Sequence, residues 1–195
     1  MVVRAAIDQL AAAMPAGLRS TVILAFWAHL RIGEIVGLRR SDIDLEKATL
    51  RVERQAVEVR GQGSVITEPK MGSRRVVHLP TPALTAVMAH VDGCGATLLP
   101  NAPLFRRPDG QPLRVTHLEW YWRRARDQVG LPHAHFHDLR HAGLTLSAQV
   151  GATLAEVMRR AGHSSSAAAM RYQHAAERRD AEIARRLSEA AENLR

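Results

Sequence analysis

Residues 133–174 read HAHFHDLRHAGLTLSAQVGATLAEVMRRAGHSSSAAAMRYQH. This stretch holds His137 and Arg140 three residues apart, and Tyr172 follows His163 by nine positions. Residues three apart share one face of a helix, so a helix that begins here would place the His137 and Arg140 side chains together. The first turn of a helix also leaves backbone N–H groups free, which favours an anion. The stretch therefore predicts a phosphate site, with Tyr172 beyond a short turn as a nucleophile or a packing residue.

Helix signals continue after this site. Thr153 and Glu156 form a capping box, which predicts a helix that stops at Gly162. We expect Ser164–Ser166 to cap a short helix that carries Tyr172. A terminal helix from about residue 176 has an apolar stripe, which suggests that it docks on a core or on a neighbouring subunit.

The N-terminal part contributes a second charged pair. Residues 18–30 are apolar almost throughout and predict a buried helix, which Arg31 follows directly. A charged residue that leaves a core segment needs a partner or water. Glu34, three residues on, can orient Arg31, although a plain structural salt bridge is the alternative.

Between these parts the pattern changes from helix to strand. Residues 49–59, 64–68 and 75–79 predict a small antiparallel sheet of about three strands, with Lys70 in the tight connection at 69–73. An exposed turn lysine is normally only solvated. Together with the helices this indicates one α+β, mainly α-helical domain over residues 1–195.

Composition favours a polyanionic partner. The formal net charge is +8 and the sequence pI is near 11, as expected for a nucleic-acid-binding protein. We expect Arg74, Arg75, Arg123 and Arg124 to contact the backbone of a nucleic-acid partner. One cysteine excludes an intrachain disulfide. The absence of a long apolar run or signal-peptide layout predicts a soluble, cytoplasmic protein that does not interact with membranes.

The ordered motifs resemble the tyrosine recombinase (phage integrase) family. Its H-x-x-R, L-G-H and Y signature is matched by His137, Arg140, Gly162-His163 and Tyr172, with Ala161 at the usual leucine. Its G-L-R-x-x-E signature, followed by G-L, is matched over Leu30–Leu38, with His29 at the usual glycine. Thr67-Glu68-Pro69-Lys70 is similar, but not identical, to the family's setting for a catalytic lysine. The resemblance covers about residues 15–175.

The resemblance implies the tyrosine-recombinase catalytic fold and a role for each matched residue. Arg31 and Arg140 would clamp the phosphate, His163 would be a second phosphate donor, Tyr172 would attack, His137 would act as base or orienting group, and Lys70 would protonate the leaving 5′ oxygen. It also implies double-stranded DNA and other protomers, as a tetramer on DNA, as partners, with neither metal nor ATP as cofactor. Family members usually carry an N-terminal core-binding domain, for which we expect no room here.

Three alternatives stay open. Four histidines at 133, 135, 137 and 141 could ligate zinc, but a helix from His137 would break their alternation. Residues 154–174 could instead form a helix-turn-helix of a non-catalytic DNA-binding regulator. That interpretation leaves the recombinase order of the six site residues unexplained. A degenerate, inactive recombinase is disfavoured because all six positions hold competent residues.

Overall fold

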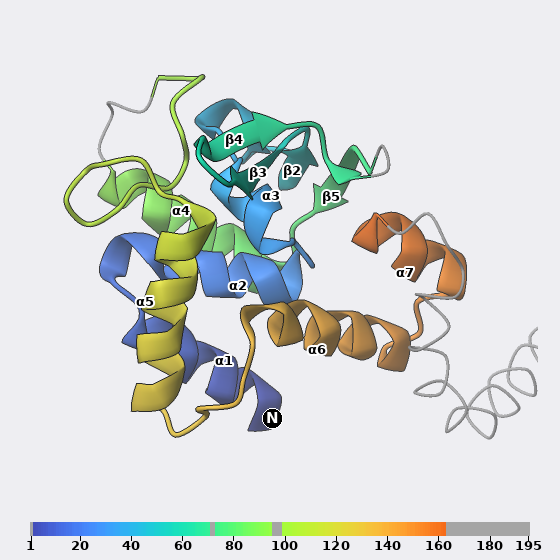
Figure 1. The fold of residues 1–195 in the computed structure, drawn as a ribbon. Coiled ribbons are helices and arrows are strands. Elements are labelled where there is room, and N and C mark those ends of the chain that lie inside the picture. The colour runs from blue at the N-terminus through green and yellow to red at the C-terminus, as the bar shows by residue number, and fades with distance from the viewer. Residues whose placement is uncertain (1, 71–72, 95–98, 163–195) are drawn as a thin grey trace, which may run out of the picture.

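A computed structural model describes residues 2–70, 73–94 and 99–162 (Figure 1). The helices are α1 (Val2–Ala13), η1 (Ala16–Leu18), α2 (Arg19–Trp27), α3 (Ile32–Val36), η2 (Arg40–Asp42), α4 (Thr81–Gly93), α5 (Val115–Gln128), α6 (Phe136–Gln149) and α7 (Leu154–Ala161). The strands are β1 (Ile43–Asp44), β2 (Thr49–Val52), β3 (Gln55–Val59), β4 (Gly63–Thr67) and β5 (Arg75–His78). The mainly helical α+β class predicted from the sequence is confirmed.

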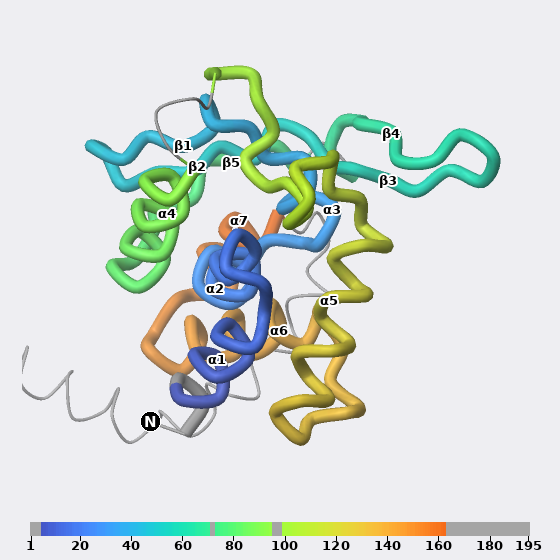
Figure 2. Tube along the Cα trace, turned by 90° about the vertical axis from the view of Figure 1, so that its left-hand side faces the viewer, coloured from blue at the N-terminus to red at the C-terminus, as the bar shows by residue number. Residues whose placement is uncertain are grey.

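Helix α2 forms the centre of the core. Its residues 20–26 are all buried, as expected for a segment that is apolar almost throughout. Helices α1, α4 and α6 pack around it (Figures 1 and 2). Helix α6 approaches α2 closely because Gly143 has no side chain; a Cβ there would collide with the carbonyl oxygen of Phe26 and the ring of His29. This contact brings the end of α2 next to the site residues of α6.

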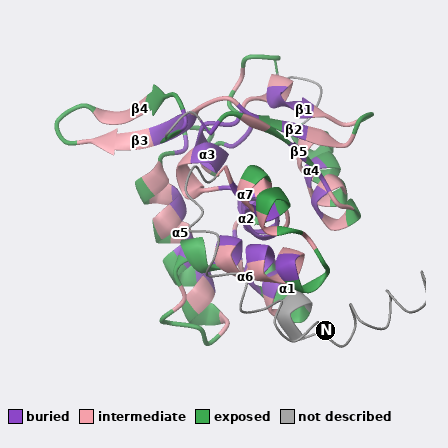
Figure 3. Cartoon of the chain, turned by 90° about the vertical axis from the view of Figure 1, so that its right-hand side faces the viewer, coloured by how far each residue is buried: buried purple, intermediate pink, exposed green. Residues whose placement is uncertain are grey.

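The strands form two small antiparallel sheets rather than the single sheet of about three strands that we expected. One sheet has the order β1-β2-β5, with Leu50 paired to Val77. The other is the β3–β4 hairpin, with Val57 paired to Val65. The chain leaves the first sheet after Val52, and Gly33 of α3 packs directly against the carbonyl oxygen of Ala56 in β3. Helix α3 therefore supports the base of the hairpin, which projects from the body (Figures 2 and 3).

Capping residues set the bounds of the last two described helices. The helix expected to carry His137 and Arg140 begins at Phe136, because the Asp138 carboxylate accepts the His135 backbone N–H at 2.7 Å. Helix α7 has the predicted Thr153–Glu156 capping box and ends at Gly162, whose φ of 62° is left-handed. The expected helices around Tyr172 and beyond residue 176 lie outside the described residues.

Helix α7 packs through a small apolar cluster of its own. Val157 and Ala161 contact Leu144 and Ala148 of α6, apart from the main core. Figure 1 shows α7 beside the body, beyond the end of β5. Among the described helices, none combines the length and the apolar character needed to cross a membrane.

Candidate active site

Glu34 is the buried anchor of the site. Its carboxylate is fully buried and accepts two bonds from Arg75, at 3.0 and 2.9 Å. It also accepts the backbone N–H of Arg31 at 2.9 Å and the Arg31 guanidinium at 2.8 Å. Burial alone would raise the pKa of Glu34, but the Arg75 hydrogen bonds and charge outweigh it and hold that pKa below its usual value. Glu34 therefore stays ionised and orients both arginines.

Arg31 is paired but still accessible. It caps the N-terminus of the short helix α3, and its side chain keeps 25% exposure. The expected pairing with Glu34 is present, but it is not private because Arg75 shares the carboxylate. Nη2 of Arg31 also donates to the carbonyl oxygen of Gly162 at 3.2 Å. Arg31 thus links the start of α3 to the end of α7.

Arg140 lies behind Arg31 in the interior. Its side chain on α6 is only 1% exposed. One nitrogen donates to the carbonyl oxygen of His29, and the other donates to that of Ala161 at 2.6 Å. Arg31 and Arg140 therefore bind successive carbonyl groups, which places the two guanidinium groups close together. In this conformation Arg31 faces solvent and Arg140 does not.

Three arginines meet the C-terminal end of α7. Arg75 donates to the carbonyl oxygen of Arg160 at 2.9 Å. Arg140 and Arg31 donate to the carbonyl oxygens of the next two residues, Ala161 and Gly162. The last carbonyl groups of a helix lack partners within the helix and carry the negative end of its dipole, so cations there are stabilising. Each arginine comes from a different element. The cluster therefore joins α3, β5 and α6 to α7 just before His163 in the sequence.

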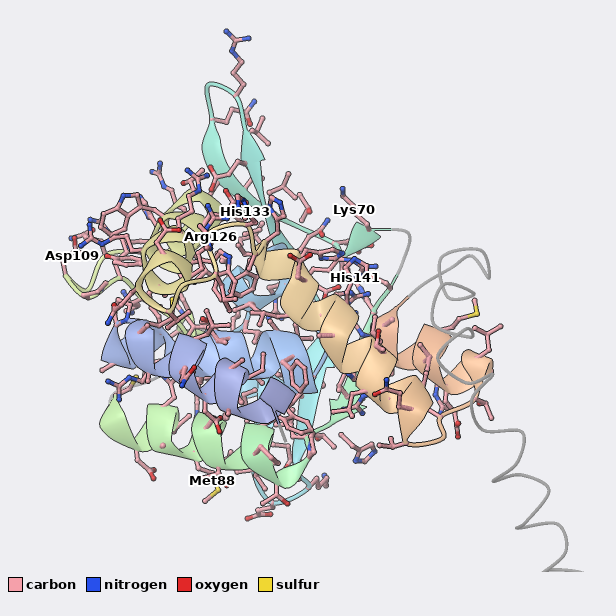
Figure 4. The ribbon with its side chains drawn as sticks, turned by 90° about the horizontal axis from the view of Figure 1, so that it is seen from below. Lys70, Met88, Asp109, Arg126, His133 and His141 are labelled. Carbon is pink, nitrogen blue, oxygen red and sulfur yellow. The ribbon has the colours of Figure 1, made fainter. Side chains whose placement is uncertain are left out.

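An open cleft of about 610 Å³ lies at the exposed side of this cluster. Arg31, Lys70 and His137 line it, together with Gly33 and residues of β3 and α5. Lys70 is exposed in the loop after β4 and projects at the side of the molecule where His141 of α6 also lies (Figure 4). Three predicted site residues, far apart in the sequence, thus share one cleft. Two carboxylates that the sequence did not indicate, Glu58 and Glu119, also line it.

His137 is held neutral in this setting. Partial desolvation of its ring, with the nearby His141, Arg140 and Arg31, lowers the pKa of His137 to about 4. Its ring packs edge-on against that of His141, with 4.4 Å between centroids. At neutral pH His137 can therefore accept a proton.

The predicted DNA contacts separate into two groups. Arg74, Arg123 and Arg124 are exposed; Arg74 pairs with Glu68, and Arg124 lies over the Trp120 ring at 5.0 Å. Arg75 does not fit that prediction, because its side chain is 5% exposed and fully engaged with Glu34 and the end of α7. The sequence could not separate Arg74 from Arg75. Adjacent residues of a strand face opposite sides, and only the packing shows which side is covered.

Some residues were missed or lie outside the described part of the chain. His163 and Tyr172 are not among the described residues. Arg160 lies beside the arginine cluster, but no sequence signal distinguished it from surface residues. Ser73 accepts from Arg31 at 3.5 Å, and its place three residues after Lys70 fits the family's setting for the catalytic lysine. Within the ranges that the structure describes, no three His, Cys, Asp or Glu side chains gather as a metal site would require.

Known proteins resemble this chain in both sequence and fold. The model of the phage integrase family matches residues 2–179. A Mycobacterium tuberculosis (strain CDC 1551 / Oshkosh) protein named as a prophage phiRv2 integrase is 39% identical over 193 residues, which cover 96% of this chain and 50% of that protein. The integrase of Mycobacterium phage FRAT1 is 38% identical over 177 residues, 89% of this chain and 53% of the phage protein. This chain thus spans about half the length of these relatives.

Solved structures agree on the fold. The Tn1549 transposon integrase, in complex with a circular intermediate DNA, has a TM-score of 0.71 at 21% identity, covering 80% of this chain and 53% of its own. The XerA recombinase has a TM-score of 0.70 at 20% identity, covering 86% and 56%. Because the family model matches most of this chain, the chain belongs to the phage integrase family.

Proposed function

We propose that this chain is the DNA-cleaving part of a site-specific recombinase of phage or prophage origin, and that it breaks and rejoins DNA through a 3′-phosphotyrosyl bond to Tyr172. The observation that carries the proposal is the shared cleft of Arg31, Lys70 and His137, with Arg140 directly behind Arg31. The integrase names of the relatives support it.

The arginines answer the first chemical requirement of the reaction. A phosphodiester repels nucleophiles, so its non-bridging oxygens need fixed positive charge in the transition state. Arg31 lines the cleft and is always charged, which suits direct donation to a phosphate oxygen. Arg140 supplies a second charge from the interior, where interactions are less screened than at the surface.

Proton transfer supplies the second requirement. The Tyr172 hydroxyl oxygen attacks phosphorus and loses its proton, the bond to the 5′ oxygen breaks, and that oxygen takes up a proton. A neutral His137 can accept the first proton, and an anionic phosphate beside its ring would raise its pKa and improve it as a base. Lys70 is the acid for the 5′ oxygen. Rejoining reverses these steps, and neither ATP nor metal is needed because the phosphotyrosyl bond keeps the energy of the broken linkage.

The proposed partners are double-stranded DNA and further protomers. Arg74, Arg123 and Arg124 are exposed and suit contacts with the DNA backbone. Binding should therefore weaken steeply as salt rises. We further propose assembly as a tetramer on DNA, with the segment after residue 176 docking on a neighbouring protomer. Deleting residues 178–195 should weaken assembly on DNA without changing cleavage by a single bound protomer.

Covalent capture from a pool of nicked duplexes with randomised central sequences tests the chemistry, because the pool supplies many candidate DNA sites at once. The whole protein that contains this chain is incubated with the pool, and SDS-resistant adducts are recovered and sequenced. We expect wild type to capture a related family of sequences and Tyr172→Phe to capture none. Tyr121→Phe is the matched control, because Tyr121 is the second of the two tyrosines and packs against Trp120 on α5.

Two outcomes would contradict the proposal. Adducts that persist in Tyr172→Phe would remove this residue from its role. If wild type forms no SDS-resistant adduct, but recovery of its bound DNA without SDS enriches one sequence, the DNA-binding regulator becomes the better account.

A further inference from the structure

His29 has a backbone conformation that few residue types tolerate. It follows the end of α2 with φ at 56°, in the left-handed region, and it is only 3% exposed. A non-glycine residue in this region costs roughly 1–2 kcal/mol. A buried, polar, strained histidine at this position therefore needs a compensating role.

The His29 ring binds the end of α7 to α6. Nε of Arg160 donates to Nδ1 of His29 at 3.0 Å. Because an arginine can only donate, Nδ1 carries no proton and Nε2 must carry it. Nε2 lies 3.3 Å from the Ser147 hydroxyl oxygen on α6, to which it donates. The contacts thus assign one neutral tautomer.

The backbone of His29 holds the site arginine. Its carbonyl oxygen accepts a hydrogen bond from Arg140. Arg140 in turn donates to the carbonyl oxygen of Ala161. His29 is therefore connected to the last turn of α7 twice, through its ring to Arg160 and through its carbonyl group and Arg140 to Ala161.

Arg160 completes the attachment of α7. Besides the His29 ring it contacts the carbonyl oxygens of Trp27 at 2.9 Å and His78 at 3.1 Å, at the ends of α2 and β5. Among the described residues, the apolar cluster under α7 contains four buried side chains, those of Leu144, Ala148, Val157 and Ala161. A helix with so little apolar contact depends on its polar attachments to keep its position.

We propose that His29 is a positioning residue: by accepting from Arg160 and from Arg140 it sets the end of α7 against the arginine cluster of the active site. The proposal rests on the proposed function, because the segment that α7 leads into contains His163 and Tyr172. Burial and the Arg160 charge also lower the pKa of His29 to about 3, so the ring remains an acceptor at neutral pH.

A pair of substitutions separates the ring's bond from the backbone strain. Asparagine tolerates the left-handed region best among non-glycine residues and presents an acceptor close to the place of Nδ1. Glycine relieves the strain completely but has no acceptor. If the role of His29 is purely conformational, His29→Gly should hold the end of α7 at least as firmly as wild type does. If His29 is a positioning residue, His29→Asn should keep the end of α7 in place and His29→Gly should loosen it.

Amide hydrogen exchange measures, without any DNA, how firmly the last turn of α7 is held. In His29→Gly we expect exchange within Val157–Ala161 to be about 10–100-fold faster than in wild type, the range that loss of a hydrogen bond to a charged group supports. His29→Asn should stay within about threefold of wild type on the same scale. Unchanged exchange in folded His29→Gly would overturn the proposal.

The rate of adduct formation on captured DNA measures the effect of each substitution on the active site. His29→Gly should slow it by at least about tenfold, since a misplacement of 1 Å can cost 100-fold, with DNA affinity unchanged and with rescue by His29→Asn. Equal rates in wild type and His29→Gly would overturn the positioning role. Failure of wild type to form any adduct would refute the proposed function instead, and the exchange comparison would then decide whether His29 anchors α7.

Discussion

Removing the negative charge of Glu34 should lower the free energy of unfolding far more than removing the charge of an exposed carboxylate. In Glu34→Gln the fully buried carboxylate is replaced by a neutral amide of the same size. Arg75, only 5% exposed, then stays in the interior without its anionic partner. Breaking a buried ion pair on one side typically costs about 3–5 kcal/mol, because the remaining charge is uncompensated.

This cost is large on the scale of the whole molecule. Domains are stable by about 5–15 kcal/mol. For a chain of this length 1 kcal/mol corresponds to roughly 2–4 °C, so we expect the melting temperature to fall by about 6–20 °C. Urea unfolding followed by circular dichroism measures the free energy of unfolding directly, and calorimetry measures the melting temperature.

An exposed ion pair provides the control. Glu68 pairs with Arg74, and their side chains are 74% and 53% exposed. Glu68→Gln should therefore change the free energy of unfolding by no more than about 1 kcal/mol. If Glu34→Gln loses less than about 1 kcal/mol as well, Glu34 does not anchor the arginine cluster and the electrostatic argument for the site is wrong.

Two further predictions concern the contact between α2 and α6. Gly143→Ala should lower the free energy of unfolding by about 1–3 kcal/mol, because the new Cβ would meet Phe26 and His29. Gly93→Ala is the control, since no atom lies within 4 Å of a Cβ there. Equal effects of the two substitutions would contradict the close approach of α6 to α2. The depressed pKa of His29 makes protonation favour the unfolded chain. Stability should thus be complete above about pH 6.5 and fall towards pH 3, by up to about 1.4 kcal/mol per pH unit. Urea midpoints between pH 7 and 4 measure this, and an unaltered pH dependence in His29→Asn would assign it to other groups.

Local signals in the sequence were sufficient for helices α2 and α7. The capping box of Thr153 and Glu156 and the glycine after α7 predicted both ends of that helix. The apolar run before Arg31 predicted the buried helix α2. These features depend on residues within a turn of each other, so the sequence contains all the information that they need.

The sheet was harder to predict. The pattern indicated strands at 49–59, 64–68 and 75–79, but it could not tell which strands pair. The chain turns out of the first sheet after Val52, so that β3 pairs with β4 and β2 pairs with β5. Pairing depends on contacts between distant residues, here including the support of β3 by α3, and strand propensity contains no such information.

The sequence by itself determined the family motifs and the local pairing of Arg31 with Glu34, because that pair is three residues apart on one turn. The tertiary structure alone decided which arginines are buried. Arg75 and Arg160 look like surface cations in the sequence, and Arg140 looks like an accessible phosphate ligand. All three are instead drawn into contacts around the end of α7. Burial of a charge depends on whether distant parts of the chain supply a carboxylate or carbonyl groups for it, and only the packed fold brings those groups together.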